Sequence, residues 1–338
     1  MRHAKIFSII VFAATLGYGA MGFYFLPLAS FQGDLTRMGM LPEIQFGWRQ
    51  PQPAIQQSWL TQASLQEADV LVIGDSFSDS RVWQTALTLH GLKVRTEHWD
   101  TMRGICANFL PWLKSQGFRG RYLVLQIIER NIEDGLDKSV ACQQMQIHPS
   151  TLADAPRHAP PTSFNPDAIE RSGRLSIGIK TEINLYEYDL IRNAPGFKFA
   201  LLPNGAIAAR VNNGCALFSH KRCDDALFLG GEKPTDLNER ALKNIEILNS
   251  RLKGLTAIWA FVPNKSTAYL YPNKRFWDEA ERRFQAPNLL HMTQQAIQNK
   301  TVDLYPANNT HFSTTGYLLM GEEILNAIQK MPSTGAGN

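Results

Sequence analysis

An uncharged stretch at the N-terminus constrains this chain more than any other feature. Residues 6–30 read IFSIIVFAATLGYGAMGFYFLPLAS, and the next charged residue is Asp34. About 20 apolar residues cross a bilayer core as a helix, whereas a cleaved signal peptide has an apolar centre of about 7–15. The triplet Leu28-Ala29-Ser30 is a poor match to a cleavage site. We therefore expect residues 1–33 to form a cytoplasmic tip and an uncleaved membrane anchor.

The charges that flank this stretch predict its orientation. Arg2, His3 and Lys5 precede it, and positively charged flanks stay in the cytoplasm. Everything after residue 33 is therefore expected to be exported. A cleaved signal peptide and a buried core helix are the alternative interpretations.

Four cysteines agree with export, because an even number in an oxidising compartment is typical of disulfides. Cys215 and Cys223 enclose seven residues after an Asn-Gly turn, which favours one bridge between them and a second between Cys106 and Cys142. Four cysteines allow three connectivities, and four separate buried thiols are the other interpretation. No C-x-x-C pair is present, so we do not expect a zinc knuckle or a thioredoxin-like centre, and we identify no metal-binding residues.

The overall charge argues against nucleic acid as a partner. The chain has 34 Lys and Arg against 30 Asp and Glu, a net charge of +4 that is spread along its length. A nucleic-acid-binding domain normally concentrates a stronger positive charge. With 338 residues, of which 44% are hydrophobic, the chain is long enough for one large domain or two smaller ones.

Strands and helices alternate along the body of the chain. Continuous apolar runs, which are typical of buried parallel strands, predict strands that end at Gly74 and that span 121–128. Residues 92–96, 256–262 and 301–305 are also expected to be strands. Apolar residues at helical spacing predict helices over 81–89 and 108–116, from Thr235 or Asp236 to Leu252, and from Ser313 or Thr314 through Ile328. The alternation predicts an α/β fold, a parallel sheet with helices on both faces.

The alternation divides the chain into regions. Residues 34–66 show no clear period and are interpreted as a loosely packed linker, and residues 67–331 as the main domain. Within that domain, prolines and aromatic residues over 149–234 interrupt the pattern and predict an insertion. Residues 332–338 are expected to be a disordered tail.

Two polar segments follow predicted strands. The first is Gly74-Asp75-Ser76-Phe77-Ser78, in which a serine directly after a buried strand exposes its hydroxyl at the sheet edge. The second is Asn308-Asn309-Thr310-His311-Phe312, in which a loop histidine precedes the last helix. Because ligands bind at the carboxyl ends of parallel strands, we expect Ser76 as nucleophile and His311 as its general base. Helix capping by Ser76 and a surface position for His311 are the alternatives.

These segments resemble a known group of enzymes. GDSFSDS, the ERN at 129–131 and NNTHFSTTG look like motifs of the SGNH hydrolase superfamily, more narrowly of its membrane-anchored, alginate O-acetyltransferase-like branch. The resemblance covers roughly residues 68–131 and 255–330. It implies a three-layer, flavodoxin-like parallel sheet, with Ser76 carrying the acetyl group. It also implies an oxyanion hole from the N–H groups of Ser76 and Gly104, with Asn131 as a further donor and Arg130 as a substrate-binding residue.

The chain departs from the family beside its histidine. The family places an Asp two or three residues before it, where this sequence has Asn309 and Asn308. An amide oxygen still orients an imidazole but adds no charge to stabilise the imidazolium. Asp303, at the end of the predicted fifth strand, is an alternative partner, and a solvated strand-end carboxylate is its simpler interpretation. A Ser–His pair, a triad with Asp303 and a protein without turnover therefore all remain open.

The function that we expect is an exported O-acetyltransferase that passes acetyl from a serine ester to an exopolysaccharide hydroxyl. The resemblance implies a multi-spanning membrane acyltransferase as acetyl donor, a polysaccharide acceptor, no cofactor, and a periplasmic domain anchored in a bacterial inner membrane through residues 6–30. Trp83 and Trp99 are candidates for stacking on sugar rings, with a place in the core as the alternative. A carbohydrate or lipid esterase and a non-catalytic glycan-binding component are the competing functions.

Overall fold

The computed structural model of this chain describes residues 2–146, 157–167, 173–232, 237 and 239–331. The chain divides into two compact units, each built from separate stretches of sequence. The first unit comprises residues 1–50, 163–231 and 305–310, and the second comprises 51–162, 232–304 and 311–338. Residues 163–167 and 173–231 of the expected insertion therefore belong to the same unit as the N-terminal helix, whereas residues 157–162 and 232 belong to the second unit.

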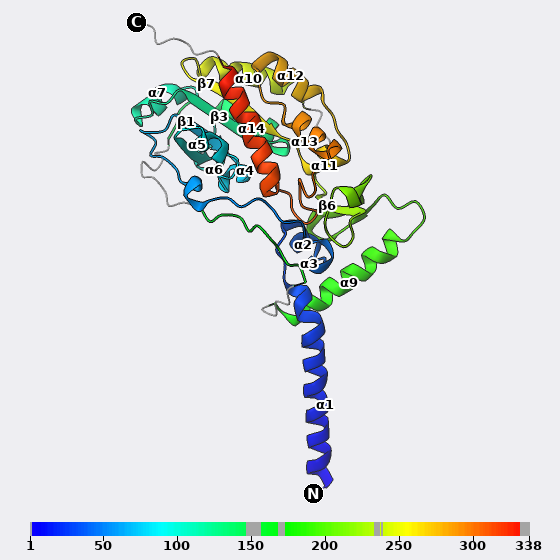
Figure 1. Cartoon of the computed structure of the whole chain (residues 1–338). Helices are drawn as coiled ribbons and strands as arrows, with labels where there is room; N and C mark the ends of the chain where they lie inside the picture. The colour runs from blue at the N-terminus through cyan, green and yellow to red at the C-terminus, as the bar shows by residue number, and fades with distance from the viewer. Residues whose placement is uncertain (1, 147–156, 168–172, 233–236, 238, 332–338) are drawn as a thin grey trace. The chain divides into compact units, whose positions relative to one another are not determined.

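A parallel sheet of four strands forms the centre of the second unit (Figure 1). Its order is β2 (Val94–His98), β1 (Val70–Gly74), β3 (Tyr122–Ile128) and β7 (Thr256–Val262). Val70 pairs with Val94 on one side and with Tyr122 on the other, and Tyr122 pairs with Thr256. The predicted α/β class and these four strands are confirmed, although β2 begins and ends two residues later than expected. Apolar runs buried on both faces are the clearest signal of parallel strands, and β1 and β3 have them.

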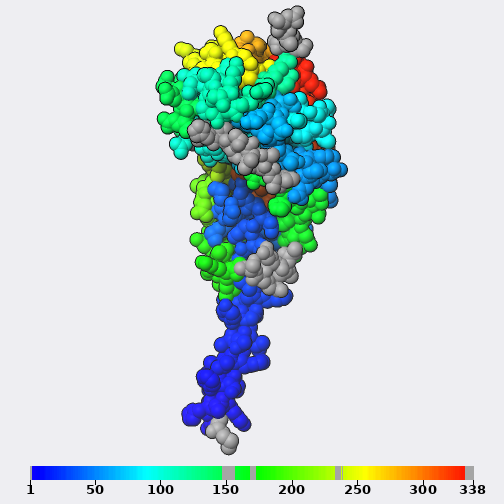
Figure 2. Space-filling model, turned by 90° about the vertical axis from the view of Figure 1, so that its left-hand side faces the viewer, coloured from blue at the N-terminus to red at the C-terminus, as the bar shows by residue number. Residues whose placement is uncertain are grey.

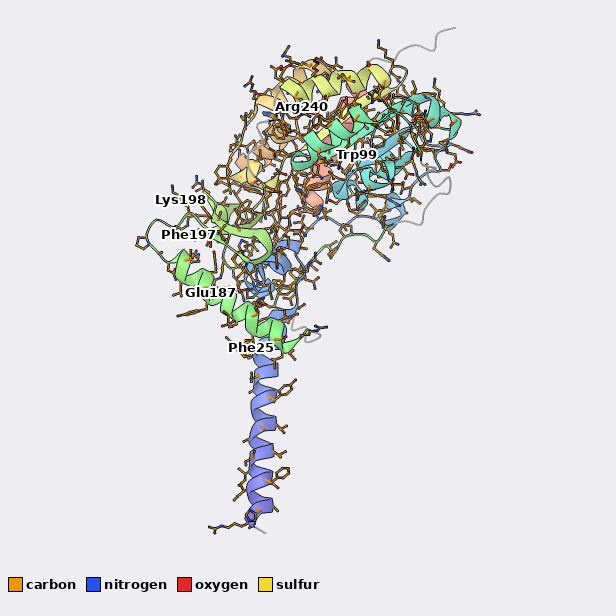
Figure 3. All side chains as sticks on the ribbon, turned by 180° about the vertical axis from the view of Figure 1, so that it is seen from behind. Phe25, Trp99, Glu187, Phe197, Lys198 and Arg240 are labelled. Atoms are coloured by element: carbon orange, nitrogen blue, oxygen red, sulfur yellow. A yellow bond between two sulfur atoms is a disulfide. The ribbon has the colours of Figure 1, made fainter. Side chains whose placement is uncertain are left out.

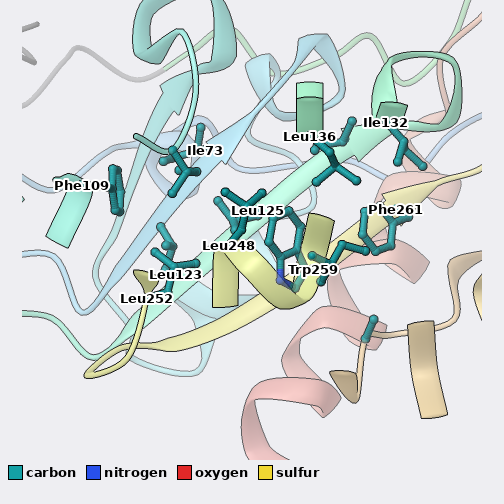
Figure 4. Close-up of a cluster of buried hydrophobic side chains, with 14 of the residues drawn as sticks. Ile73, Phe109, Leu123, Leu125, Ile132, Leu136, Leu248, Leu252, Trp259 and Phe261 are labelled. Atoms are coloured by element: carbon teal, nitrogen blue, oxygen red, sulfur yellow. The ribbon is translucent and has the colours of Figure 1, made fainter. Parts of the chain in front are cut away.

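One face of this sheet carries the large hydrophobic cluster of the second unit. Side chains of β1, β3 and β7 meet helices α7 (Phe109–Ser115), α8 (Ile132–Ala141), α10 (Glu239–Arg251) and α12 (Arg275–Phe284) there. Figure 4 shows Leu125 and Trp259 of the sheet against Leu136 and Leu248 of the helices. Each of these side chains is about 1% exposed or less, and burial of one such side chain contributes about 1.5–3 kcal/mol.

Helices on the other face complete the second unit. Helices α13 (Leu289–Gln298) and α14 (Thr314–Lys330) both contact β7, and α14 also packs on α5 (Thr85–Leu89). The expected last helix is confirmed, and Ser313 caps it by accepting a hydrogen bond from the Gly316 N–H at 3.3 Å. The cap expected for α10 at Thr235 or Asp236 lies outside the described residues, as does the tail 332–338.

Two sequence expectations about this unit are wrong. Residues 301–305 form turns and bends instead of a fifth strand, and Asp303 has a left-handed φ of 53°, which no strand residue adopts. The helix expected from Arg81 begins only at Thr85, because Arg81 also has a left-handed φ, of 60°.

The other short helices of the unit are η2 (Gln57–Leu60), α4 (Ser76–Asp79), α6 (Trp99–Met102), η3 (Glu129–Asn131) and α11 (Lys265–Tyr269).

The first unit begins with a long apolar helix. Helix α1 (Arg2–Phe25), which continues into η1 (Leu26–Ala29), is long and apolar enough to cross a membrane, and none of its residues is buried. Figure 2 shows its side chains without a protein covering along most of its length. This confirms an exposed, apolar N-terminal helix, which is consistent with a signal sequence or an anchor.

The remainder of the first unit surrounds a small antiparallel sheet. Its strands are β4 (Phe199–Leu201), β5 (Ala206–Arg210) and β6 (Asp225–Leu229), in that order, with η4 (Pro203–Gly205) and η5 (Gly214–Ala216) in the connections. Helices α2 (Asp34–Gly39), α3 (Glu43–Phe46) and α9 (Leu175–Arg192) complete it. The loose packing expected over 34–66 is wrong, because Leu35, Leu41 and Phe46 are 0% exposed in the core of this unit.

Both expected disulfides are present. Cys106–Cys142 lies in the second unit and Cys215–Cys223 in the first, and no described cysteine is free. Disulfides persist outside the reducing cytoplasm, so this pairing is typical of an extracytoplasmic domain.

Candidate active site

Ser76 lies at the carboxyl end of β1, as the first residue of the short helix α4. The chain turns sharply there, because the carboxylate of Asp75 accepts a hydrogen bond from the Phe77 N–H at 3.0 Å. Gly74 makes this turn sterically feasible: a Cβ at position 74 would lie 2.2 Å from the Ser78 Oγ. The half-buried Ser76 is thereby presented at the sheet edge, where open α/β folds bind ligands.

A buried polar network fixes this turn to the neighbouring strand. Gln126 of β3 is 0% exposed; its Nε2 donates to Asp75 Oδ1 at 2.9 Å, and its Oε1 accepts from the Asp75 N–H at 3.1 Å and from Ser78 Oγ at 2.7 Å. The Ile128 N–H donates to the second Asp75 oxygen at 2.7 Å. Because each bond is formed away from water, the network holds the turn in a single conformation.

His311 meets Ser76 directly. Its Nε2 lies 2.8 Å from Ser76 Oγ, although the two residues are 235 positions apart in the sequence. The imidazole packs on Phe77 with ring centroids 4.7 Å apart, and Phe77 in turn contacts the rings of Phe312 and Tyr317. With the proton on Nδ1, the Nε2 atom accepts from the serine hydroxyl, which is the arrangement of a serine nucleophile and its base.

The two candidates for orienting His311 have different surroundings. Asp303 is 0% exposed and belongs to the second unit, like His311. Asn309 is half-buried, belongs to the first unit and donates its N–H to the Pro306 oxygen at 3.1 Å. A carboxylate that is completely removed from water requires a hydrogen-bonding or charged partner, which makes Asp303 the stronger candidate.

A cavity of about 720 Å³ opens beside Ser76. It is lined by Asp75, Ser76, His98, Trp99, Asp100, Arg103, Gly104, Ile127, Asn131, Asp134, Gly135 and Lys138. Among the described residues, the N–H groups of Ser76 and Gly104 and the side-chain amide of Asn131 have no hydrogen-bond acceptor. Ser76 and three uncommitted donors thus line the same cavity.

The Gly104 loop is fastened to α8 and α10. The Ile105 N–H donates to Ser139 Oγ at 3.1 Å, and the Cys106–Cys142 disulfide joins the loop to the C-terminal end of α8. Arg251 donates to the carbonyl oxygens of Ile105 at 3.0 Å and of Ser139 at 2.7 Å. The position of the Gly104 N–H therefore depends on covalent and charged contacts outside the cavity.

Arg130 does not line this cavity. Its guanidinium pairs with Glu232 at 3.0 Å, and the Glu232 carboxyl also accepts from Ser266 Oγ at 3.2 Å. Burial raises the pKa of Glu232 above its usual value, although Arg130 acts in the opposite direction. Arg130 thus neutralises a buried carboxyl beside the sheet instead of facing Ser76.

The expected role of Trp83 as a sugar platform is wrong. Its side chain is 0% exposed, and its Nε1 donates to Ser78 Oγ at 3.1 Å, so neither face of the indole is open to a ligand. Trp99 instead lines the cavity, half-buried, with its Nε1 donating to the Gln126 carbonyl oxygen at 2.7 Å.

Sequence reasoning missed Gln126, Ser78 and Arg251. Gln126 had a detectable signal, since it is the one polar side chain after Tyr122 in the apolar run of β3, and a polar group inside a buried strand needs a partner. Arg251 ends an amphipathic helix, where basic residues are common, so its sequence position carried no comparable signal.

Comparisons with models of protein families, with curated proteins and with solved structures found no match to this chain.

Proposed function

We propose that this chain is a membrane-anchored, exported O-acyltransferase that carries an acetyl group on Ser76 and passes it to a carbohydrate hydroxyl. The observation that carries the proposal is the 2.8 Å contact between His311 Nε2 and Ser76 Oγ. The resemblance of the GDSFSDS and NNTHFSTTG segments to the SGNH hydrolase superfamily and its alginate O-acetyltransferase-like branch supports it further. The three-layer sheet of that superfamily is part of the same proposal.

In the first half-reaction, Ser76 Oγ forms a bond to the acyl carbon of the donor while His311 Nε2 takes the hydroxyl proton. The carbonyl oxygen becomes an oxyanion, for which the N–H groups of Ser76 and Gly104 and the Asn131 amide are suitable donors. As the carbonyl re-forms, the bond to the leaving group breaks, and the leaving group takes the proton from His311. The product is an acetyl ester of Ser76.

In the second half-reaction, a hydroxyl of the acceptor gives its proton to His311 Nε2 and attacks the ester carbon. The bond to Ser76 Oγ then breaks, and Oγ recovers the proton. The cavity has room for a sugar ring beside Trp99, and its mixed charges, among them Arg103 and Asp134, suit hydroxyl and carboxylate groups. A polysaccharide is therefore the acceptor that we propose.

Asp303 is the residue to which we assign the orientation of His311. Its carboxyl is completely buried, and in a serine triad such a carboxylate holds the imidazole in the correct tautomer and stabilises the imidazolium. Asn309 supplies an amide only, without the charge.

The N-terminal helix and the disulfides support an extracytoplasmic location. We propose that α1 is an uncleaved anchor in a bacterial inner membrane and that both units are periplasmic. A multi-spanning membrane acyltransferase is then the proposed acetyl donor, and no cofactor is required for the two steps.

An esterase is the second candidate, because a cavity of this size beside Ser76 also admits water. The two functions share the acetyl-serine and differ in its fate. Full-length protein in detergent is treated with p-nitrophenyl acetate, with and without neutral or uronate oligosaccharides. Mass spectrometry then follows acetyl groups on the Ser76 peptide and on the sugars.

Acetyl-Ser76 followed by acetylated oligosaccharide supports the transferase, whereas acetyl-Ser76 that yields only acetate supports the esterase. Ser76→Ala abolishes both products, and Ser80→Ala, a nearby serine outside the cavity, serves as the matched control. If Ser76 is neither acetylated nor labelled by a fluorophosphonate, the result would support a non-catalytic binding protein.

A further inference from the structure

Helix α9 carries exposed apolar side chains on the face opposite its buried side. Its inner face is buried on the first unit, where the Tyr188 hydroxyl donates to Asp225 Oδ2 at 2.7 Å and Asn184 Nδ2 donates to the Met40 oxygen at 3.2 Å. Its outer face carries Ile183, Tyr186 and Leu190, which are 51%, 64% and 58% exposed. Spacings of three and four residues place these three side chains in one stripe.

This outer stripe is unusual for a helix that faces water. A surface helix normally has a polar side opposite its buried side, and a helix that is apolar all round is normally buried. Charged residues of α9, such as Lys180 and Glu182, lie instead along its flanks, between the buried face and the exposed apolar stripe. The stripe therefore has the composition of a covered surface.

The surroundings of α9 indicate what covers it. Its first turns pack on the C-terminal end of the apolar N-terminal helix: a Cβ at Gly178 would lie 1.9 Å from the Phe25 oxygen, and Tyr24 Oη donates to Glu182 at 3.2 Å. Figures 1 and 3 show α9 leading away from that end of α1, past Glu187, and α9 also contacts β4. The stripe and the end of α1 thus belong to one side of the first unit.

The length of α1 sets the level of the membrane surface. Its 24 residues extend about 36 Å at 1.5 Å per residue, and a bilayer core is about 30 Å thick. A helix of this length leaves the hydrocarbon close to Phe25, which is where α9 packs. The start of α9 is therefore at the boundary between lipid headgroups and acyl chains.

We propose that α9 is an interfacial helix whose Ile183, Tyr186 and Leu190 side chains insert into the outer boundary of the same bilayer. This inference rests on the proposed anchoring by α1. Apolar side chains bind there by leaving water, and tyrosine is enriched at that depth. Because the charged flanks of α9 carry both signs, its binding does not require anionic lipid. Helices α1 and α9 together then attach the first unit to the membrane at two places.

Spin labels on the full-length chain in phosphatidylcholine vesicles test this. All four cysteines are paired, so an introduced cysteine is the only free thiol. Nitroxides are placed by Ile183→Cys, Tyr186→Cys and Leu190→Cys in the stripe. Lys180→Cys, on a flank of the same helix and nearer to α1, is the matched control, and Phe12→Cys tests the anchor itself.

Accessibility to oxygen, relative to a water-soluble nickel chelate, is measured for each label after circular dichroism confirms folding. For the stripe labels, the ratio of oxygen accessibility to nickel-chelate accessibility is expected to be several-fold higher than for the label at position 180. Equal ratios would overturn the inference, and so would stripe labels shielded from both reagents, which indicate a protein neighbour. A label at position 12 outside lipid would overturn the proposed anchor instead.

Discussion

Gln126 and Asp75 bind each other through two hydrogen bonds. The Gln126 amide nitrogen donates to the Asp75 carboxylate at 2.9 Å, and the Asp75 N–H donates back to the Gln126 oxygen at 3.1 Å. Gln126 therefore acts on Ser76 without touching it, as a positioning residue for the turn that presents the proposed nucleophile.

Replacement of this glutamine is expected to impair both stability and rate. Gln126→Met keeps the volume but leaves the Asp75 N–H and the Ser78 hydroxyl unsatisfied, at about 1–3 kcal/mol for each buried group. A displaced Ser76 costs on the order of 100-fold in kcat. Thermal unfolding and single-turnover acetylation of Ser76 measure the two effects, and unchanged acetylation would show that Gln126 has only a packing role.

Ser76 and His311 are expected to act as one group. Ser76→Ala is expected to abolish acetyl-enzyme formation, and His311→Ala to lower its rate by on the order of 10⁴-fold or more. Because a base and its nucleophile contribute non-additively, the double variant is expected to be no slower than Ser76→Ala. Burst kinetics with p-nitrophenyl acetate measure these rates, and a clear burst from Ser76→Ala would exclude Ser76 as the nucleophile.

The partner of His311 can be identified by comparing two substitutions. Asp303→Asn is expected to lower kcat by about 10³–10⁴-fold with little change in KM, because the imidazole loses its orienting charge. Asn309→Ala is expected to have an effect of less than tenfold. The pH profile of kcat separates orientation from general damage, since only loss of the orienting charge moves its acidic limb. The reverse order of the two effects would assign the role to Asn309.

The Cys106–Cys142 disulfide is expected to support catalysis as well as stability. A bridge across 36 residues stabilises the fold by about 4 kcal/mol in the chain-entropy model, and this bridge also holds the loop of Gly104. Cys106→Ala/Cys142→Ala should therefore lower kcat for the acetylation of Ser76.

Cys215→Ala/Cys223→Ala provides the matched control. It removes a bridge across 8 residues in the first unit, worth about 2.5 kcal/mol by the same model, and should leave kcat of the folded protein unchanged. Equal losses of kcat in the two double variants would contradict a specific role of Cys106–Cys142.

The buried carboxyl of Glu43 is expected to make the stability of the first unit depend on pH. Burial raises the pKa of this carboxyl, although the N–H groups of Gln32 and Gly33, the Thr36 hydroxyl and the Asn308 amide all donate to it. Since the folded-state pKa is above the unfolded value, the group stabilises the fold below the unfolded pKa, and this contribution is lost as pH rises through the folded value.

Wild-type protein should therefore gain stability relative to Glu43→Gln when the pH is lowered from 7.5 to 5. Thermal unfolding of both proteins in one detergent at the two pH values measures the difference. If the stability of the wild type relative to Glu43→Gln instead increases when the pH is raised, the four hydrogen-bond donors lower the pKa of Glu43 by more than burial raises it.

The sequence was most informative where one physical effect dominates. Residues 256–262 are an apolar run buried on both faces, and β7 has these bounds. The last helix has a serine cap and apolar residues at helical spacing, and α14 begins after that serine. Ser76 was identifiable because it directly follows the buried strand β1. His311 was expected after a strand over 301–305 that does not form, so only its place in a polar loop before the last helix was a sound signal.

Other elements depend on contacts that no local pattern contains. Asp303 and Arg81 have left-handed backbones, so a strand and the start of a helix were expected where the chain turns. Residues 34–46 have no period because short helices bury Leu35, Leu41 and Phe46 separately. Strand β5, Ala-Ile-Ala-Ala-Arg, is rich in alanine, which is a poor strand former.

The first unit is completed by its last short stretch, residues 305–310. Asn308 accepts from the Leu35 N–H at 3.0 Å, and Ala307 accepts from the Leu227 N–H at 3.0 Å. At a synthesis rate of about 5–20 residues per second, the ribosome needs on the order of ten to fifty seconds to proceed from residue 50 to residue 310. During that interval residues 1–50 lack this closing stretch, so chaperones and proteases can act on them before the first unit is complete.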